Sequence, residues 1–403
     1  MRKLLVMLGA VLGALMPAAA AAQTKLVVWH SYRGGEKSAF EKLVSTFNAR
    51  PDTKLKVDAL AVPFDAFADK ISAAVPRGKG PDIFIYAQDR MGGWVEAGNT
   101  VEPIDFYMDD ALKGRFIPTT VEALTYRGNL YGLPLDYKVI ALIYNKKLLK
   151  TPPKSTGELV KVAQGLTNKA AGKFGLAWAY GDFYYVASLI NGFGGGVFDK
   201  ATRPTMNAPE NVKALELLVK WEKAGFMPAE PSSALITSLF NEKKSPMVFS
   251  GPWFLGEVSS DIEYGVAPLP TIDEAGSKPM RPWMTVEGVF VSAQSQHKEA
   301  AFEFAKYATG IEAGKVMALE GRQSPAATAV YDDPKVAADP VLSAFRKQVE
   351  VAVPMPNVAE MTMMWSPATT ALNKINAGTA PKEALDVAQK ALQKDVDALR
   401  KKK

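Results

Sequence analysis

The spacing of apolar residues between positions 26 and 86 constrains the fold of this chain more than any other feature. Short apolar runs at residues 26–29, 55–60 and 82–86 have the length and composition of buried strands. Between them, residues 36–48 and 67–74 place large apolar side chains on one face of a helix. A strand–helix–strand–helix–strand order calls for parallel strands joined by right-handed crossovers. The sequence therefore predicts an α/β fold with mainly parallel sheets flanked by helices.

A second group of elements follows along the chain. Residues 142–144 and 246–249 are strand-like, residues 157–166 and 212–219 are helical, and a last helix begins at about Pro381. With 403 residues, the chain is too long for a single core of the usual size, so two domains are expected. No linker rich in Pro, Gly or Ser separates two halves, which predicts domains built from discontinuous segments.

The first residues, MRKLLVMLGAVLGALMPAAAAAQT, have the pattern of an export signal. Two basic residues precede an apolar stretch from Leu4 to Met16, and small residues suited to cleavage follow, ending near Ala22. Residues 1–22 are therefore predicted to be a signal peptide, with a retained membrane anchor as the alternative. Cysteine is absent, which excludes a lipid anchor on cysteine and any disulfide. The periplasm is the expected location.

Few catalytic classes fit the composition. The formal net charge is +6, but Lys and Arg are scattered, so no nucleic-acid partner is expected. The two histidines, His30 and His297, follow no triad pattern, and the chain contains no GxSxG, phosphate-binding loop or HExxH motif. We expect no metal and no cofactor. Converging carboxylates among Asp89, Asp182 and Glu287 would suit glycoside hydrolysis, so a secreted carbohydrate-active enzyme remains an alternative.

Aromatic residues beside the polar ends of elements indicate a sugar ligand. The stretch GPDIFIYAQDRMGGW ends a predicted strand and then supplies Tyr86, Asp89 and Arg90. The carboxyl ends of parallel strands are where ligands bind in α/β sheets. Aromatic faces stack on the apolar faces of sugar rings, while carboxylate and guanidinium groups bind hydroxyls. Taken singly, each ring is more often part of a core. Further candidates are Asp182, Tyr184, Trp253 and Trp365.

Several blocks of sequence, in order along the chain, resemble one known family. They are LVVW, GPDIFIYAQDRMGGW, ALIYNKKLL, FSGPW, YGVAPLP, MPNVAEMTMMW and INAGTAPKEALDVAQ. The chain is similar through these blocks to the periplasmic maltose-binding proteins, the sugar-binding receptors of ABC importers, from about Leu26 to near the carboxyl terminus. The resemblance implies a non-catalytic, monomeric receptor that binds a sugar or oligosaccharide and delivers it to an inner-membrane permease by hinge closure.

The resemblance also implies the organisation of the chain. Two α/β lobes would enclose a ligand cleft. The amino-terminal lobe would hold residues 25–135 and 286–334. The carboxyl-terminal lobe would hold residues 138–281 and 341–403. The hinges would lie near 135–138, 281–286 and 334–341.

The same resemblance assigns a binding role to seven residues. Those implied as stacking rings are Tyr86, Tyr184, Trp253 and Trp365, and those implied as hydroxyl-binding groups are Asp89, Arg90 and Asp182.

Three departures from the family pattern bear on the ligand. Lys138 stands where the family has an acidic residue near a hinge, Arg33 and Gly34 stand where it has an Asp-Lys pair, and Ser366 replaces a tyrosine. Two additional cations near the cleft lead to the hypothesis of an acidic or phosphorylated sugar, in which Lys138 and Arg33 bind the ligand. The alternative is that both cations face solvent or pair with Asp89, Asp136 or Glu287.

Overall fold

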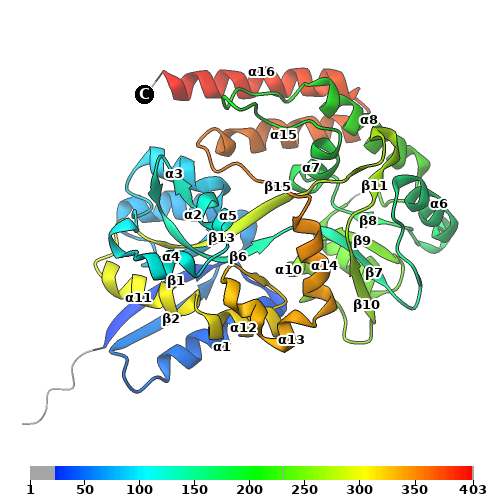
Figure 1. Ribbon diagram of the computed structural model, residues 1–403. Helices are drawn as coiled ribbons and strands as arrows, with labels where there is room; N and C mark the ends of the chain where they lie inside the picture. Colours follow the sequence, from blue (N-terminus) through cyan, green and yellow to red (C-terminus); the bar gives the residue numbers. More distant parts are fainter. Residues whose placement is uncertain (1–22, 230, 402–403) are drawn as a thin grey trace, which may run out of the picture.

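The protein has two α/β lobes that lie side by side (Figure 1). A computed structural model describes residues 23–229 and 231–401, so the predicted signal peptide at 1–22 lies outside the described residues. We call the part built on the larger, seven-stranded sheet the first lobe, and the part built on the four-stranded sheet the second lobe. The predicted α/β class with two lobes is confirmed.

The amino-terminal half of the first lobe follows the predicted order. Strands β1 (Thr24–His30), β2 (Leu55–Ala61) and β3 (Ile83–Ala87) are parallel neighbours in the spatial order β3-β1-β2. Helix α1 (Gly34–Asn48) connects β1 to β2, and α2 (Phe64–Ala74) connects β2 to β3. Because these strands are parallel, their carboxyl ends meet at one edge of the sheet.

Other strands of the first lobe arrive from distant parts of the chain, and most of them are antiparallel. The sheet order is β14-β6-β13-β3-β1-β2, with β15 pairing to β13 in addition. Strand β13 is antiparallel to both β3 and β6, and β14 is antiparallel to β6. The bounds are β6 (Gly132–Lys138), β13 (Trp283–Val291), β14 (Ser324–Pro325) and β15 (Val353–Pro354). The expectation of mainly parallel sheets is therefore wrong for β6, β13 and β14, which the chain brings in from distant segments, whereas β15 is parallel to β13.

The second lobe also has a mixed sheet, in the order β10-β7-β9-β8. Strand β7 is antiparallel to β9 and β10, whereas β8 and β9 are parallel. The bounds are β7 (Ala141–Asn145), β8 (Ala177–Trp178), β9 (Met247–Ser250) and β10 (Tyr264–Ala267). Two small antiparallel pairs complete the strands, namely β4 (Thr125–Tyr126) with β5 (Asn129–Leu130) and β11 (Thr271–Ile272) with β12 (Lys278–Pro279).

Helices cover the sheets of both lobes. The shorter ones are α3 (Met91–Ala97), α4 (Asp110–Gly114), α5 (Pro118–Ala123), α9 (Ser233–Asn241), α10 (Pro252–Leu255), α12 (Ile311–Leu319) and α13 (Pro334–Ala337). The longer ones are α6 (Thr156–Leu166), α7 (Phe183–Gly192), α8 (Pro209–Ala224), α11 (Lys298–Ala308), α14 (Pro340–Val349), α15 (Met361–Asn376) and α16 (Pro381–Arg400). Proline occupies the first turn of α16, as predicted, and α8 ends at Gly225 with a left-handed φ of 73°.

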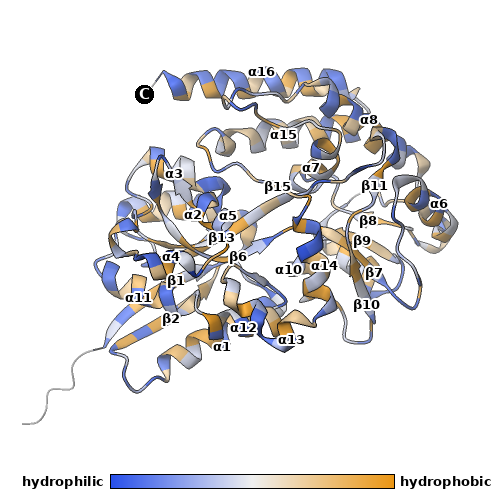
Figure 2. Ribbon diagram, viewed as in Figure 1, coloured by the Kyte–Doolittle hydropathy of each residue, from blue (hydrophilic) through white to orange (hydrophobic). Residues whose placement is uncertain are grey.

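The buried residues form two clusters that share the sheet of the second lobe. On β7, Ile143 belongs to the cluster around the first lobe, while Leu142 belongs to the cluster formed with α7, α8, α15 and α16. Successive strand residues point to opposite faces, so both faces of this sheet are covered. Figure 2 shows apolar strands inside and polar residues on the outer helices. Among residues 23–229 and 231–401, no helix is both long and apolar enough to cross a bilayer.

Candidate functional site

Polar side chains follow two neighbouring parallel strands of the first lobe at the sheet edge where both strands end. Strand β1 ends at His30, and Arg33 immediately precedes α1. Strand β3 ends at Ala87, and the 3₁₀ turn η2 (Gln88–Arg90) then carries Asp89 and Arg90. Parallel pairing brings these two segments to a single edge, as the sequence predicts.

Asp89 connects the two lobes. It is 4% exposed and accepts a hydrogen bond of 3.1 Å from the indole N–H of Trp365, which lies on α15 of the second lobe. The Arg90 Nε atom is 3.1 Å from the same carboxylate, and the Arg90 guanidinium lies 5.6 Å from the centroid of the Trp365 ring. The structure therefore brings together three of the candidate residues from the sequence, namely Asp89, Arg90 and Trp365.

Close backbone packing supports this junction. The Gly92 N–H donates to the Asn357 carbonyl at 3.1 Å, and a Cβ atom on Gly92 would collide with that carbonyl oxygen. A glycine is required at this position because the segment before α15 approaches the backbone of α3 so closely. Gly92 of the GPDIFIYAQDRMGGW stretch thus has a packing role.

A row of aromatic rings extends from Trp365 across the second lobe. Ring centroids are 6.0 Å apart for Trp365 and Trp283, 6.3 Å for Trp283 and Tyr184, and 6.0 Å for Tyr184 and Trp253. The Trp253 indole N–H also donates to the hydroxyl of Tyr185 at 3.3 Å. The predicted rings Tyr184, Trp253 and Trp365 are therefore brought together. Sequence reasoning missed Trp283, whose only local signal is its position after a proline at the start of a strand.

Asp182 caps the helix that carries Tyr184. Its carboxylate accepts a hydrogen bond of 2.9 Å from the Tyr184 N–H at the start of α7. The side chain is exposed, yet burial among surrounding groups raises its pKa, and the charge of Asp65 at the start of α2 raises it further. Asp65 of the first lobe and Asp182 of the second lobe thus lie near enough for their charges to interact.

Lys138 is buried in a cluster of charged groups near the junction of the lobes. Its Nζ atom is 3.0 Å from Glu287 and 3.3 Å from Glu36, and it lies 5.1 Å from the centroid of the Tyr32 ring. The Tyr32 hydroxyl donates to Glu287 at 2.9 Å. The expected alternative, that Lys138 pairs with Glu287, is therefore what the structure shows. Glu36, in the first turn of α1, was not anticipated as a partner.

The strand register explains why this cluster needs a cation. Asp136 on β6 lies directly opposite Glu287 on β13, and like charges in such a position destabilise a sheet. Burial, followed by the charge of Glu287, raises the pKa of Asp136 well above its ordinary value, which favours the protonated carboxyl. Burial acts to lower the pKa of Lys138, but the three surrounding carboxyl groups outweigh it and raise that pKa. Lys138 therefore keeps its charge.

Arg33 forms a second contact between the lobes. Its Nε atom is 2.8 Å from Glu257, which follows α10 of the second lobe. Beside it, Gly34 has a φ of 50°, and a Cβ atom there would lie 2.7 Å from the Gly256 carbonyl oxygen. The lobes thus touch through backbone at this point. Arg33 pairs with a carboxylate, although not with one of the three that the sequence suggested.

The carboxylates considered for hydrolysis all have partners within the protein. Asp89 accepts from Trp365, Asp182 from the first turn of α7, and Glu287 from Tyr32 while also pairing with Lys138. Within the described part of the chain, no three His, Cys, Asp or Glu side chains are grouped as a metal site requires. Burial lowers the pKa of His30 to about 4, so this imidazole is neutral.

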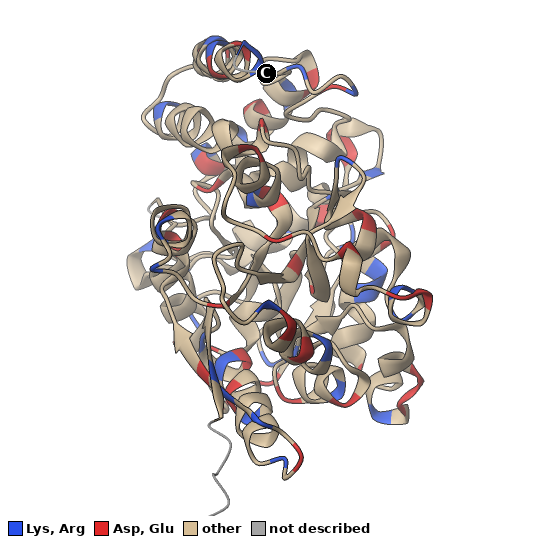
Figure 3. Ribbon diagram, turned by 90° about the vertical axis from the view of Figure 1, so that its left-hand side faces the viewer, with Lys and Arg blue, Asp and Glu red and all other residues tan. Residues whose placement is uncertain are grey.

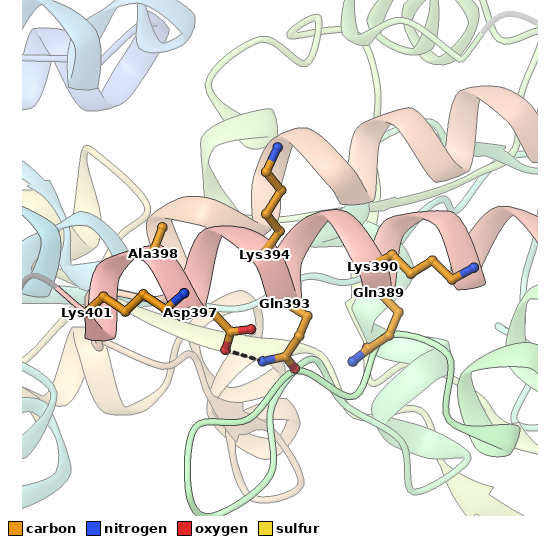
Figure 4. Close-up of a pocket in the computed structure, with 7 residues that line it drawn as sticks. All are labelled: Gln389, Lys390, Gln393, Lys394, Asp397, Ala398 and Lys401. Carbon is orange, nitrogen blue, oxygen red and sulfur yellow. Dashed lines mark hydrogen bonds between the residues drawn. The ribbon is translucent and has the colours of Figure 1, made fainter.

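Surface hollows elsewhere do not contain the predicted residues. One lies along the outer face of α16 and is lined by Gln389, Lys390, Gln393, Lys394, Asp397, Ala398 and Lys401 (Figure 4). Another is lined by Lys113, Gly114, Phe116, Pro118, Val121, Glu122, Thr125 and Thr328. In the view of Figure 3, residues of both charges are interspersed along the ribbon.

Replacing Asp89 by asparagine is expected to stabilise the arrangement of the lobes seen in the structure, in a pH-dependent way. Burial raises the pKa of Asp89 to about 6, opposed by the charge of Arg90 and the Trp365 hydrogen bond. The native state therefore binds the extra proton, and its stability falls as the pH rises through about 6. Asp89→Asn should gain on the order of 2 kcal/mol at about pH 8 and lose this advantage near pH 4, measured by urea unfolding. A gain that is equal at both pH values, or a similar gain in the exposed control Asp58→Asn, would contradict this explanation.

Comparisons with known proteins agree with this architecture. A family model described as bacterial extracellular solute-binding protein matches residues 33–315. The maltotriose-binding protein of Pyrococcus abyssi is 32% identical over 358 residues, covering 87% of this chain and 77% of that protein. The galactooligosaccharide-binding protein of Bacillus subtilis is 28% identical over 390 residues, covering 93% and 90% respectively.

Solved structures show the same fold. The maltotriose-binding protein of Thermus thermophilus, solved with maltotriose, superposes with a TM-score of 0.84 at 28% identity, covering 92% of this chain and 100% of that one. A maltose/maltodextrin-binding domain from Bdellovibrio bacteriovorus, bound to maltotriose, gives a TM-score of 0.86 at 23% identity, covering 93% and 100%. Since the family model matches more than half of the chain and the fold is shared over nearly all of it, the protein belongs to the bacterial extracellular solute-binding proteins.

Proposed function

We propose that this protein is the solute-binding receptor of an ABC importer and that it binds a neutral oligosaccharide between its two lobes. The observation that carries the proposal is the row of rings Trp253, Tyr184, Trp283 and Trp365, which ends at the Asp89 carboxylate and the Arg90 guanidinium of the opposite lobe. Rings bind the apolar faces of sugars, and charged planar groups bind their hydroxyls.

The relatives support an oligosaccharide as the ligand. Those that match over most of their length include proteins named for maltotriose, galactooligosaccharide and maltodextrin. A further structure, at 30% identity and a TM-score of 0.77, is a cyclo/maltodextrin-binding protein complexed with maltotetraose. The partly exposed rings Trp253, Tyr184 and Trp365 suit a ligand with several sugar units, because each unit offers an apolar face. Trp283 is 3% exposed and packs between Tyr184 and Trp365.

The pairing of the two additional cations favours a neutral ligand over an acidic or phosphorylated one. Lys138 is 6% exposed and held by Glu287 and Glu36, and Arg33 is held by Glu257. An anionic ligand would have to displace these carboxylates or accept their repulsion. Lys138 is therefore proposed as a structural group at the base of the site, and Arg33 as a link between the lobes.

Binding is proposed to stabilise a closed arrangement of the lobes. The lobes would be residues 25–135 with 286–334 and residues 138–281 with 341–403, moving about the segments near 135–138, 281–286 and 334–341. The Arg33–Glu257 ion pair and the Asp89–Trp365 hydrogen bond join elements of opposite lobes and would break on opening. A ligand that touches both lobes shifts the equilibrium towards closure because it binds the closed state more tightly.

The proposal also covers the cellular location of the receptor and its protein partner. The family is extracellular, and the finer location proposed here is the periplasm, reached through a signal peptide cleaved near Ala22. The partner would be an inner-membrane permease that recognises the closed monomer. The chain is proposed to be non-catalytic, since each candidate carboxylate already has a protein partner.

The test is a ligand panel measured with the mature protein by calorimetry and tryptophan fluorescence. The panel contains maltose, maltotriose, maltotetraose, a galactooligosaccharide, sugar acids and sugar phosphates. Saturable binding of a neutral oligosaccharide, with a change in the emission of Trp253 and Trp365, is the expected result. Binding of anions alone would overturn the neutral-ligand proposal. Product formation that Asp89→Asn abolishes would favour the carbohydrate-active enzyme instead.

A further inference from the structure

Three aromatic rings of the first lobe pack against one another, and one of them is exposed. The rings of Phe67 and Tyr86 are parallel within 5° at a centroid distance of 5.0 Å. The ring of Phe64 also packs against Tyr86, at a centroid distance of 5.4 Å and tilted by 23°. Phe67 is fully buried, and Tyr86 is 4% exposed, whereas Phe64 is 52% exposed. Tyr86 therefore contacts both phenylalanine rings and is enclosed, and Phe64 is the ring that meets solvent.

The position of Phe64 places it beside the proposed site. It begins α2, just after β2 ends at Ala61, so it lies at the sheet edge that also carries Arg33, Asp89 and Arg90. Its neighbour Asp65 is close enough to Asp182 of the second lobe to raise the pKa of that carboxyl. The charge of Asp65, at the start of α2, thus reaches the start of α7, which carries Tyr184 of the second-lobe row of rings.

Phe106, another exposed ring of the first lobe, lacks this arrangement. It is 93% exposed, and its ring contacts Tyr107 edge-on rather than face to face, in a 3₁₀ turn formed by Asp105–Tyr107. A single exposed apolar side chain is ordinary in soluble proteins. Phe64 differs because its ring packs nearly face to face on Tyr86, which packs in turn on the buried Phe67, so that an incoming ring would meet a surface that is already oriented. Little conformational freedom would be lost on binding.

We infer that Phe64 is the first-lobe stacking surface for a pyranose ring of the bound oligosaccharide, and that Tyr86 and Phe67 position it from behind. This inference rests on the proposed function. It assigns to Phe64 the stacking role that the family resemblance implies for Tyr86. The ligand would then lie between a phenylalanine on the first lobe and the rings Trp253, Tyr184 and Trp365 on the second. Aromatic surfaces on both walls would couple binding to closure.

The test measures maltotriose binding by calorimetry for the mature wild type and four variants. Phe64→Ala should weaken binding by about tenfold or more, because an aromatic contact is lost. Phe64→Leu, which keeps apolar bulk without a ring, should also weaken binding, while Phe64→Trp should restore affinity to near that of the wild type. Phe106→Ala is the matched control and should bind like the wild type. Because Phe64 is half exposed, thermal unfolding should change little in its variants.

The outcomes separate this inference from the proposed function. If the wild type binds maltotriose and Phe64→Ala binds it within about twofold of the wild type, the stacking role of Phe64 is wrong while the receptor function stands. The stacking role is equally wrong if Phe64→Leu and Phe64→Trp bind with the same affinity. If the wild type binds no oligosaccharide of the panel, the proposed function fails and the inference fails with it.

Discussion

Replacing Lys138 by methionine should destabilise the protein by about 3–5 kcal/mol at neutral pH. The substitution keeps most of the side-chain volume but leaves Glu36, Asp136 and Glu287 buried together without a cation. Removing one member of a buried ion pair costs far more than the pair contributes, because an uncompensated charge remains away from water. The measurement is the free energy of unfolding from urea titrations of the ligand-free protein.

Two further measurements identify the cause of that loss. Without Lys138, burial and mutual repulsion raise the pKa of the carboxyl groups in the folded state, so the deficit should shrink as the pH falls and they become protonated. Adding Glu287→Gln should recover part of the stability at neutral pH. Lys42→Met is the matched control, since Lys42 and its partner Glu320 are both about half exposed, and it should change stability by about 1 kcal/mol or less. An equal loss in both single variants would refute the buried-cluster explanation.

Replacing Trp365 by alanine should weaken maltotriose binding by roughly 2–4 kcal/mol, a factor of about 30 to 1,000 in Kd. The half-buried Trp365 ring is the point where the row of second-lobe rings meets Arg90 and Asp89 of the first lobe. Its removal would take away a stacking face and leave the Asp89 carboxylate without its interlobe donor. Calorimetric titration of wild type and variant at equal salt and pH measures the change.

Trp365→Phe distinguishes the ring from its N–H group. If the stacking face of the ring accounts for most of the affinity, Trp365→Phe should bind maltotriose nearly as tightly as the wild type. If the hydrogen bond to Asp89 accounts for it, Trp365→Phe should bind as weakly as the alanine variant. A variant with alanine at 365 that binds maltotriose as tightly as the wild type would remove Trp365 from the proposed site. Phe106→Ala again serves as the control for a general effect of losing an aromatic side chain.

The site shows how much residue types alone can predict. Asp89, Arg90, Tyr184, Trp253 and Trp365 are all candidates from sequence because aromatic and charged residues stand at the ends of predicted elements. The structure brings them together in one region. Their grouping could be expected in part because parallel strands end at a common edge. Their contacts across the two lobes could not be predicted, because no local sequence pattern indicates which distant helix packs against a given strand end.

The residues that sequence reasoning missed depend on burial and register. Trp283 lies in β13, and the sequence around it gives no reason to expect it between Tyr184 and Trp365. Phe64 and Tyr86 are both aromatic residues near a sheet edge, and only their packing reveals that Tyr86 is enclosed while Phe64 is exposed. Likewise, the antiparallel strands β6 and β13 depend on pairings between segments about 150 residues apart.

The sequence by itself determined the elements whose signals are local. The period of apolar residues specified β1, α1, β2, α2 and β3, and the glycine and proline positions specified where α8 ends and α16 begins. Tertiary structure alone decided the roles of the cations. Lys138 is a structural charge because the register of β6 against β13 opposes Asp136 to Glu287, and because α1 adds Glu36. Periodicity is set by backbone geometry within one element, whereas the partner of a buried charge is set by segments that only the folded chain brings together.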